Sequence, residues 1–394
     1  MLILMTIGTP DFTGAPRMAF DIARALVAAG HRLIVVTGRR PVDGRASVID
    51  KLRGIGIEAV EEDGFDRQIP DRGLIRRISE LVVRERVQLL LSEVQLDVKI
   101  MVFVAQKTKV PLVYHALNHV MFHNRSFMVR ALKKYLYGRL LRKRVAKVIC
   151  CSESVRIQHI REFRIPESRA VTIDNGIDLS RFKPIDQAER DRIRSDFGIS
   201  NDQLMLLNVG RITHQKGQDL LLRSLIQADL AGRDYRLVLI GARAPDSDED
   251  AEYEQKLHRL ADAPELKGKC IFAGWRNDVP SVLHSADAYF HSANWEGLPL
   301  AVLEAMAAGL PTVWTDCAGT LSGFAPGVHG YIARTGDQPG FTSLIEELLS
   351  LTESQRREMG RAAVELVRTT FDVEILGRRF VEQVQQAATP IGAM

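Results

Sequence analysis

Short apolar runs alternate with amphipathic stretches through the first half of the chain. The run 2–7 predicts a strand, and apolar residues at helical spacing over 15–29 predict a helix that ends at Gly30. Continuously apolar runs of this kind are typical of strands in a parallel sheet covered on both faces. Further strands are predicted at 33–37, 89–92, 112–115 and 148–151. This alternation of strands and helices predicts a doubly wound α/β domain.

The alternation is interrupted at 175–178 and then begins again. A charged stretch at 186–196 leads into a second α/β series, with strands predicted at 205–209, 236–240, 270–272, 288–290 and 312–314. A length of 394 residues suits two domains of ordinary size. We therefore predict two Rossmann-like domains, over 1–185 and 186–372, and a C-terminal segment 373–394 whose helix packs back towards the first domain.

The composition is that of a soluble globular protein, with 46% hydrophobic and 26% charged residues. No segment approaches the roughly 20 unbroken apolar residues of a membrane-spanning helix. The apolar N-terminus lacks a basic start and a cleavage site, so we expect a strand rather than a signal peptide. The four cysteines show no metal-ligand spacing and are expected to be reduced thiols in a cytoplasmic protein.

Residues 125–147 form a local basic block. They hold nine basic side chains and no acidic one, in a chain whose net charge is +4. Met128, Leu132 and Leu136 share one helical face, and a basic amphipathic helix can lie on an anionic membrane surface. A core-packed helix with a solvated basic face is the alternative. A nucleic acid is the less favoured partner, because no aromatic stacking platform accompanies the charge.

The segment 296–311 places two glutamates around a predicted helix start. Pro299 suits the first turn of this helix and Gly309 suits its C-terminal end, so Glu296 precedes the helix and Glu304 lies within it. A helix N-terminus attracts phosphate through its unpaired donors and partial positive charge. Unpaired backbone N–H groups are expected at Leu298, Leu300 and Ala301. An ordinary helix with two surface carboxylates is the alternative.

A second candidate phosphate site is the loop 208–217, between a predicted strand and a predicted helix. Gly210 allows a tight turn, and Arg211 and Lys216 can meet a diphosphate, the first as a planar fork and the second as a point charge. A solvated basic loop remains the alternative. The Asp-x-Asp pattern at 246–248 follows a proline in a polar turn, and we expect a solvated loop there rather than a metal site.

The first domain offers weaker signals. Gly14 lies in the loop after the first strand and would allow close approach of a phosphate or an acceptor, but its interval from Gly8 does not fit the dinucleotide fingerprint. His115 ends the predicted strand 112–115 and is the first candidate site histidine of this domain. His119 and His123 compete with it, although both lie beyond the strand end. A satisfied core histidine is the alternative.

Taken in order, these motifs resemble glycosyltransferase family 4, and the resemblance covers nearly the whole chain. Its marks are the Gly-Arg and Lys-Gly pairs of 210–217, the segment 272–278, the two glutamates separated by seven residues, and the segment 305–312. The family has the GT-B fold, in which two Rossmann-like domains face each other across a cleft. Family members commonly carry a Gly-Gly pair and a following Glu in the first loop, where this chain has Gly14-Ala15 and Arg17.

The resemblance implies a role for each candidate residue. Arg211 and Lys216 would neutralise the donor diphosphate, Glu304 would bind the ribose, and Glu296 would contact the donor sugar near its 3- and 4-hydroxyls. His115 would lie beside the anomeric carbon. Main-chain groups would contact the phosphate and sugar at Gly297, Leu298, Pro299 and Leu300, and the base edge at Gly274, Trp275 and Arg276. The family needs neither a metal nor a bound cofactor.

The resemblance therefore implies a retaining glycosyltransferase that moves a sugar from a nucleoside diphosphate to a hydroxyl of a glycan or lipid-linked acceptor. A UDP-sugar is the first choice of donor and GDP-mannose the second. We expect a cytoplasmic enzyme of cell-surface polysaccharide, lipopolysaccharide or glycolipid assembly, peripheral on the inner face of the membrane. The alternatives are a GT-B nucleotide-sugar epimerase and a non-catalytic membrane-associated scaffold.

Overall fold

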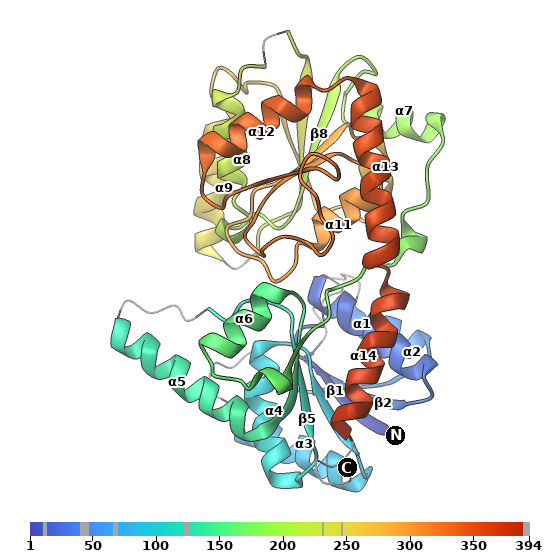
Figure 1. The fold of residues 1–394 in the computed structure, drawn as a ribbon, viewed down its shortest axis with the longest axis vertical. Helices are drawn as coiled ribbons and strands as arrows, with labels where there is room; N and C mark the ends of the chain where they lie inside the picture. The colour runs from blue at the N-terminus through green and yellow to red at the C-terminus, as the bar shows by residue number, and fades with distance from the viewer. Residues whose placement is uncertain are drawn as a thin grey trace. The chain divides into compact units, whose positions relative to one another are not determined.

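The chain forms two compact units in a computed structural model (Figure 1), which describes residues 1–10, 14–39, 47–65, 70–121, 126–230, 232–245 and 247–388. Unit 1 comprises Met1–Gly176 together with Val373–Met394, and unit 2 comprises Ile177–Asp372. The sequence-based boundary at 185/186 lies further along the chain, after the Asn175–Asp178 interruption rather than within it.

Unit 1 is built on a seven-stranded sheet in the order β3-β2-β1-β4-β5-β6-β7, and every neighbouring pair is parallel. Its strands are β1 Leu2–Ile7, β2 Arg32–Thr37, β3 Glu58–Glu61, β4 Leu89–Ser92, β5 Leu112–Ala116, β6 Val145–Cys150 and β7 Ala170–Thr172. The central strands are buried along almost their whole length, which agrees with their continuous apolar sequences.

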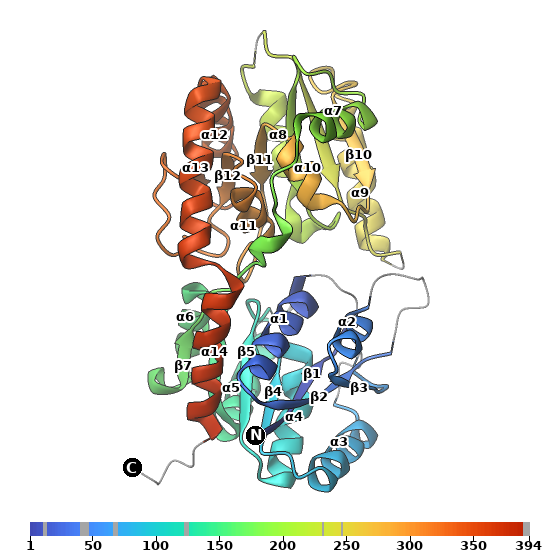
Figure 2. The same cartoon turned by 90° about the vertical axis from the view of Figure 1, so that its right-hand side faces the viewer.

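Helices cover both faces of this sheet (Figures 1 and 2). They are α1 Gly14–Ala28, α2 Val48–Gly54, α3 Arg72–Arg84, α4 Gln95–Thr108, α5 Phe127–Arg144, α6 Glu153–Arg161 and α14 Val373–Ala388. The last of these packs against α1, β5 and β6. Its apolar stripe supplies Phe380, whose ring meets that of His115 edge-on at a centroid distance of 4.9 Å.

Unit 2 is built on a six-stranded parallel sheet in the order β10-β9-β8-β11-β12-β13. Its strands are β8 Leu204–Val209, β9 Tyr235–Ile240, β10 Cys270–Gly274, β11 Ala288–His291, β12 Thr312–Thr315 and β13 Tyr331–Ala333. Its helices are α7 Gln187–Asp196, α8 Gln218–Gln227, α9 Asp248–Ala261, α10 Val279–Ser285, α11 Leu300–Ala307, α12 Gln338–Ser350 and α13 Glu353–Thr370. The prediction of two doubly wound domains is confirmed.

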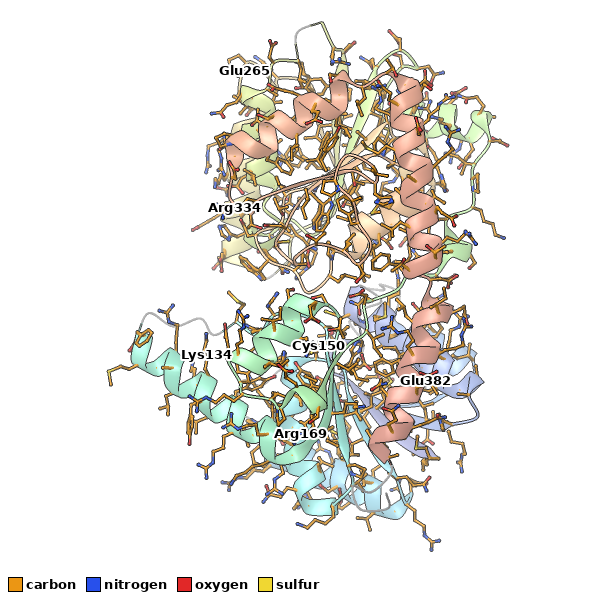
Figure 3. All side chains as sticks on the ribbon, in the orientation of Figure 1. Lys134, Cys150, Arg169, Glu265, Arg334 and Glu382 are labelled. Atoms are coloured by element: carbon orange, nitrogen blue, oxygen red, sulfur yellow. The ribbon has the colours of Figure 1, made fainter. Side chains whose placement is uncertain are left out.

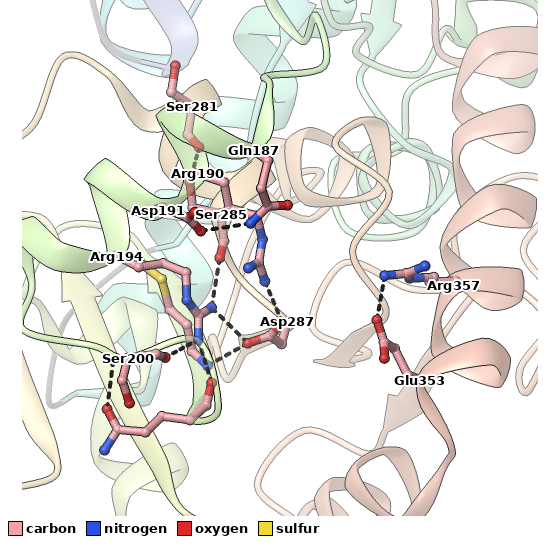
Figure 4. A network of polar contacts seen from close by, with 12 residues as sticks. Gln187, Arg190, Asp191, Arg194, Ser200, Ser281, Ser285, Asp287, Glu353 and Arg357 are labelled. Carbon is pink, nitrogen blue, oxygen red and sulfur yellow. Dashed lines mark hydrogen bonds and ion pairs between the residues drawn. The ribbon is translucent and has the colours of Figure 1, made fainter.

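A buried arginine joins the first helix of unit 2 to its sheet (Figure 4). Arg194 on α7 is 1% exposed, and its guanidinium donates to the carbonyl oxygens of Ser285 at 3.1 Å and Ser200 at 2.9 Å. It also meets the Asp287 carboxylate at 3.0 Å, and that carboxylate accepts from the backbone N–H of Met205 at 2.7 Å. The polar centre therefore fixes α7 against the starts of β8 and β11.

We expect Arg194→Met to lower the free energy of unfolding of unit 2 by about 3 kcal/mol, because it leaves buried acceptors without their charged donor. The three tryptophans of the chain, Trp275, Trp295 and Trp314, all lie in unit 2, so urea titration followed by tryptophan fluorescence reports this unit.

The matched control is Arg192→Met on the same helix. Arg192 is exposed, and its ion pairs among the described residues are with Glu189 and Asp196 of its own helix, so its loss should leave the urea midpoint close to that of the wild type. Equal midpoints for the two variants would show that the Arg194 centre does not stabilise unit 2.

Candidate functional site

The strand order of unit 2 places a topological switch point between β8 and β11. From β8 the chain proceeds outward to β9 and β10, whereas β11 begins the opposite series. In open parallel sheets the crevice at the carboxyl ends of such neighbouring strands is the usual ligand position. The loops that follow β8 and β11 are 210–217 and 292–299, the two segments that carry the candidate phosphate and sugar ligands.

Glycines allow the first of these loops to approach its neighbours closely. Gly217 has a φ of 62°, and a Cβ there would lie 2.1 Å from the carbonyl oxygen of Ser292. At Gly241, with a φ of 140°, a Cβ would lie 1.9 Å from the carbonyl oxygen of Gly210. Both positions therefore require glycine. The aliphatic stem of Lys216 crosses the face of Gly210, where an added Cβ would meet it at 3.4 Å.

Hydrogen bonds then join this loop to the segment after β11. The Asn294 side chain donates to the carbonyl oxygen of His214 at 2.6 Å, and its backbone N–H donates to that of Gln215 at 2.8 Å. In return the Gln215 amide donates to the carbonyl oxygen of Trp295 at 3.1 Å. These contacts fix the register of the two loops, and they bring Lys216 and Glu296 together.

Lys216 and Glu296 form a partly buried ion pair, with the ammonium on the carboxylate oxygen Oε1. Burial alone would raise the pKa of Glu296, but the charge of Lys216 and the neighbouring His291 lower it to about 2. The carboxylate is therefore ionised throughout the physiological range. With 7% of its surface exposed, Glu296 is not the solvated side chain of an ordinary helix terminus.

The helix after this glutamate begins where the sequence predicts it. Pro299 is the N-cap of α11, and Gly309, with a φ of 78°, follows its C-cap. The prediction that the Leu300 N–H is unpaired is wrong. This N–H donates to the carbonyl oxygen of Leu298 at 3.0 Å, in a turn that precedes the helix. Glu304, in the second turn, lies 3.5 Å from the guanidinium of Arg181.

The other candidates of unit 2 differ in exposure and in their contacts. Arg211 is exposed, and only a long contact of 3.5 Å to Gln215 is described for its guanidinium, so the side chain can meet an anion. Gly274 ends β10 with a φ of 64°, and Trp275 beside it is 53% exposed. Arg276 instead pairs with Asp278 at 2.8 Å and lies over the ring of Phe197.

In unit 1 the structure places His115 inside the fold. The side chain is 1% exposed, its Nδ1 lies 2.8 Å from Glu93 Oε2, and its ring packs on Phe380. His119 is half-buried, and its Nε2 lies 3.2 Å from Ser154 Oγ. Gly14 is exposed at the first residue of α1. His123 lies outside the described residues, as do 11–13 of the first loop.

Sequence reasoning missed two buried acids at the carboxyl edge of the first sheet. Asp97 is fully buried, accepts the Gly8 N–H at 2.9 Å, and has its pKa raised to about 7, chiefly by burial and also by Glu93, against the lowering effect of hydrogen bonds. A Cβ at Gly8 would lie 2.2 Å from the Asp97 carboxylate. Glu93 follows β4 directly, and a carboxylate at the end of a buried strand was the available signal.

The acidic segment near 248 belongs to a helix start. Asp248, Glu249 and Asp250 form the first turn of α9, where acidic side chains complement the helix dipole, and Ser247 caps it by accepting the Asp250 N–H at 3.1 Å. Asp246 lies outside the described residues. Within the described part of the chain no cluster of His, Cys, Asp and Glu has the arrangement of a metal site.

Helix α5 presents an apolar surface to solvent. The apolar side chains of its first half are 38–79% exposed, and they are Phe127, Met128, Val129, Leu132, Tyr135 and Leu136. The helix packs instead through Tyr137, Gly138 and Leu141. Lys134 (Figure 3) pairs with Glu162 at 2.8 Å, and Lys147 donates to Gln386 on α14 at 3.0 Å. Arg125 lies outside the described residues.

The alternative that the apolar face of α5 packs into the core is therefore wrong. Lys147, at the end of the basic block, bonds to α14 instead of facing solvent freely. No helix in the described ranges combines the length and the apolar character that crossing a bilayer requires.

Because the pKa of Glu296 is lowered on folding, its carboxylate should stabilise the folded protein at neutral pH and lose this effect in acid. A carboxyl whose folded pKa is about 2, against an ordinary 4.5, contributes stability that is complete above about pH 4.5 and is lost as the pH falls towards 2. Relative to Glu296→Gln, the wild type should lose about 3 kcal/mol of unfolding free energy across this window. Urea titrations followed by tryptophan fluorescence at several pH values measure it.

The control for this series is Glu249→Gln, which removes an exposed carboxylate from α9. Its unfolding free energy should follow that of the wild type across the same pH range. A constant difference between wild type and Glu296→Gln down to pH 3 would mean that the ion pair does not hold the carboxylate ionised.

Comparison with known proteins agrees with this geometry. Residues 189–365 match the family model "Glycosyl transferases group 1", and 12–181 match "Glycosyltransferase Family 4". Spore coat protein SA of Bacillus subtilis is 28% identical over 54% of this chain and 58% of its own length. An Escherichia coli UDP-Gal:alpha-D-GlcNAc-diphosphoundecaprenol alpha-1,3-galactosyltransferase is 25% identical over 64% of this chain and 62% of its own length.

The chain thus spans about three fifths of the length of these relatives. Among solved structures, Anabaena HepE in complex with UDP and glucose has a TM-score of 0.83 at 18% identity, over 98% of this chain and 100% of that one. The two family models together cover most of the chain, and the structural likeness extends through both units. The chain therefore belongs to glycosyltransferase family 4 and has the GT-B fold.

Proposed function

We propose that the protein is a retaining glycosyltransferase that transfers a sugar from a nucleoside diphosphate to a hydroxyl of a glycan or lipid-linked acceptor. The observation that carries the proposal is the Lys216–Glu296 ion pair at the switch point of unit 2, with Arg211 exposed in the same loop. Family membership supports it. A UDP-sugar is the favoured donor, since the similar E. coli enzyme is named for UDP-Gal and HepE was solved with UDP and glucose. GDP-mannose is the second choice.

In this proposal the diphosphate lies between the loop 210–217 and the start of α11. Arg211 and Lys216 neutralise it, and the main chain of 297–300 contributes the partial positive charge of a helix N-terminus. Glu304 accepts hydrogen bonds from the ribose hydroxyls. The turn 274–276 reads the base edge through its main chain, beside the exposed ring of Trp275.

The proposed reaction is a front-face displacement. The bond between the anomeric carbon and the β-phosphate oxygen breaks, and the acceptor oxygen bonds to the same face of that carbon. The acceptor proton passes to the leaving phosphate oxygen, so atoms and charge balance without a metal or a cofactor. Arg211 and Lys216 stabilise the charge that grows on the phosphate. Glu296, kept ionised, orients the sugar as it acquires positive character.

We expect Arg211→Ala and Lys216→Ala each to lower kcat/KM by about two orders of magnitude, because a contact to developing charge is worth roughly 3 kcal/mol. The assay follows nucleotide release from UDP-sugars and GDP-mannose, with and without a chelator, because the proposal needs no metal.

The matched control is Arg361→Ala, which removes an exposed arginine from α13, and it should retain wild-type turnover. Wild-type activity in both loop variants would remove the diphosphate assignment. Activity lost in chelator and restored by Mg²⁺ or Mn²⁺ would contradict the metal-free reaction. Release of an epimerised sugar without acceptor would favour the epimerase alternative.

We also propose that α5 docks this cytoplasmic protein on the anionic inner face of the membrane. Its exposed apolar side chains include Phe127 at 75% and Met128 at 79% exposure, and the exposed cations Arg130, Lys133 and Lys143 lie on the same helix. An exposed apolar patch with interleaved cations fits a bilayer interface, which accepts apolar groups and attracts positive charge. Such docking would bring the enzyme to a lipid-linked acceptor.

Substitution of Arg130, Lys133 and Lys143 by Gln should reduce flotation with anionic vesicles strongly, because each cation near such a surface contributes about 1 kcal/mol. The double variant Phe127→Ser with Met128→Ser should reduce the fraction of protein that still floats with the vesicles at high salt. The matched control replaces Arg357, Arg361 and Arg368 of α13 by Gln and should float like the wild type. Equal recovery with neutral and anionic vesicles would contradict the proposal.

A further inference from the structure

A buried histidine lies directly behind the ion pair of the candidate site. His291 is the last residue of β11 and is 1% exposed. Its Nε2 lies 3.5 Å from Glu296 Oε1, and its Nδ1 lies 3.3 Å from the hydroxyl of Tyr289. That hydroxyl donates in turn to the carbonyl oxygen of Val209 at 3.3 Å. A polar chain therefore runs from β8 through Tyr289 and His291 to the carboxylate.

One oxygen of Glu296 faces two groups. Lys216 and His291 both approach Oε1, but Lys216 holds it, while the Nε2 of His291 has no hydrogen-bond partner among the described residues. A buried ring nitrogen without a hydrogen-bond partner is unusual in a folded protein. Here the nearest acceptor is Glu296 Oε1, which lies 3.5 Å away and is held more closely by the ammonium.

Protonation decides whether the polar chain can be complete. If neutral His291 carries its proton on Nδ1, the Tyr289–Val209 bond is kept and the Nε2 lone pair faces a carboxylate. If the proton is on Nε2, Nδ1 must accept from Tyr289, whose hydroxyl then leaves Val209. Only the imidazolium donates at both ends and lets Tyr289 donate onward.

A diphosphate at this site would change the balance. Under the proposed function Lys216 turns its ammonium to the phosphate. Glu296 then loses its ion pair with Lys216 at Oε1. A carboxylate left buried and uncompensated is strongly destabilised unless it gains another donor. His291 is already in place on the same oxygen.

We propose that His291 takes up a proton and binds Glu296 Oε1 when Lys216 turns to the donor diphosphate, so that Glu296 stays ionised and oriented towards the sugar. His291 is then a positioning residue. The inference rests on the proposed function. One proton passes from solvent or buffer to the imidazole, so the new N–H bond forms as the bond between the proton and its donor breaks, and no other covalent bond changes.

The charges around His291 support this exchange. Burial lowers the pKa of His291 below its ordinary 6.5, the attraction of Glu296 opposes this, and the charge of Lys216 lowers it further. Neutralisation of Lys216 by phosphate removes one of the lowering causes.

Two other titratable groups near Glu296, Tyr289 and Cys317, stay neutral. Burial and Glu304 on α11 raise the pKa of Tyr289 well above its usual range. Burial raises the pKa of Cys317, after β12, to about 12, with the charge of Glu296 adding to the rise. Neither group therefore changes its charge near neutral pH, whereas a histidine can titrate there.

The test is the number of protons taken up when UDP or GDP binds. Calorimetric titration in buffers with different ionisation enthalpies gives this number at each pH from about 6.5 to 8.5. His291→Gln keeps an N–H for Glu296 but cannot be protonated, and His291→Asn is a second, smaller variant. Because the same nucleotide is titrated in every protein, the difference in proton uptake from the wild type reports the substitution at His291.

We expect the wild type to take up more protons than either variant, by a fraction approaching one at the most favourable pH. We also expect His291→Leu, which offers no donor, to bind the nucleotide at least tenfold more weakly than His291→Gln. The control His258→Gln, on α9, should match the wild type in both respects.

Nucleotide binding with equal proton uptake in the wild type, His291→Gln and His291→Asn would overturn this inference and leave the proposed function standing. Failure of the wild type to bind UDP and GDP would overturn the proposed function and the inference together.

Discussion

The site depends on one constraint, which is that a carboxylate removed from water needs a cation. Lys216, with the neighbouring His291, keeps Glu296 ionised despite its burial, and Lys216 and Glu296 lie 80 positions apart in sequence. The close approach of Gly217 to Ser292, and the bonds of Asn294 and Gln215 across the two loops, bring them together. The glycine positions and the amide contacts thus serve the same electrostatic requirement.

The architecture could be predicted from the sequence because its signal is local. Buried parallel strands are continuous apolar runs, and β1, β4, β8 and β11 follow theirs within a residue or two. The edge strand β3 was not predicted, because its sequence Glu-Ala-Val-Glu is half charged. An edge strand is covered on fewer sides and so needs no continuous apolar run. The interruption at 175–178 marked the change of unit, whereas the boundary itself was placed too far along the chain.

The candidate site could be predicted only in part, because its residues act through partners that are distant in sequence. Motif spacing singled out Lys216, Glu296 and Arg211, but not that the first two would pair. A histidine at a strand end looks alike whether it faces a ligand or the core, and His115 proved to lie between Glu93 and Phe380. Asp97 and His291 carry no motif, and their importance appears only from burial.

The placement of α14 has a consequence for biosynthesis. This helix follows unit 2 in the chain but packs on α1, β5 and β6 of unit 1, where Phe380 covers the ring of His115. Domains generally fold as they emerge from the ribosome. Unit 2 can therefore close before unit 1 has received α14, so the unit that begins earlier in the chain is completed later. Until then the nascent chain exposes the surface of α1, β5 and β6 that α14 covers.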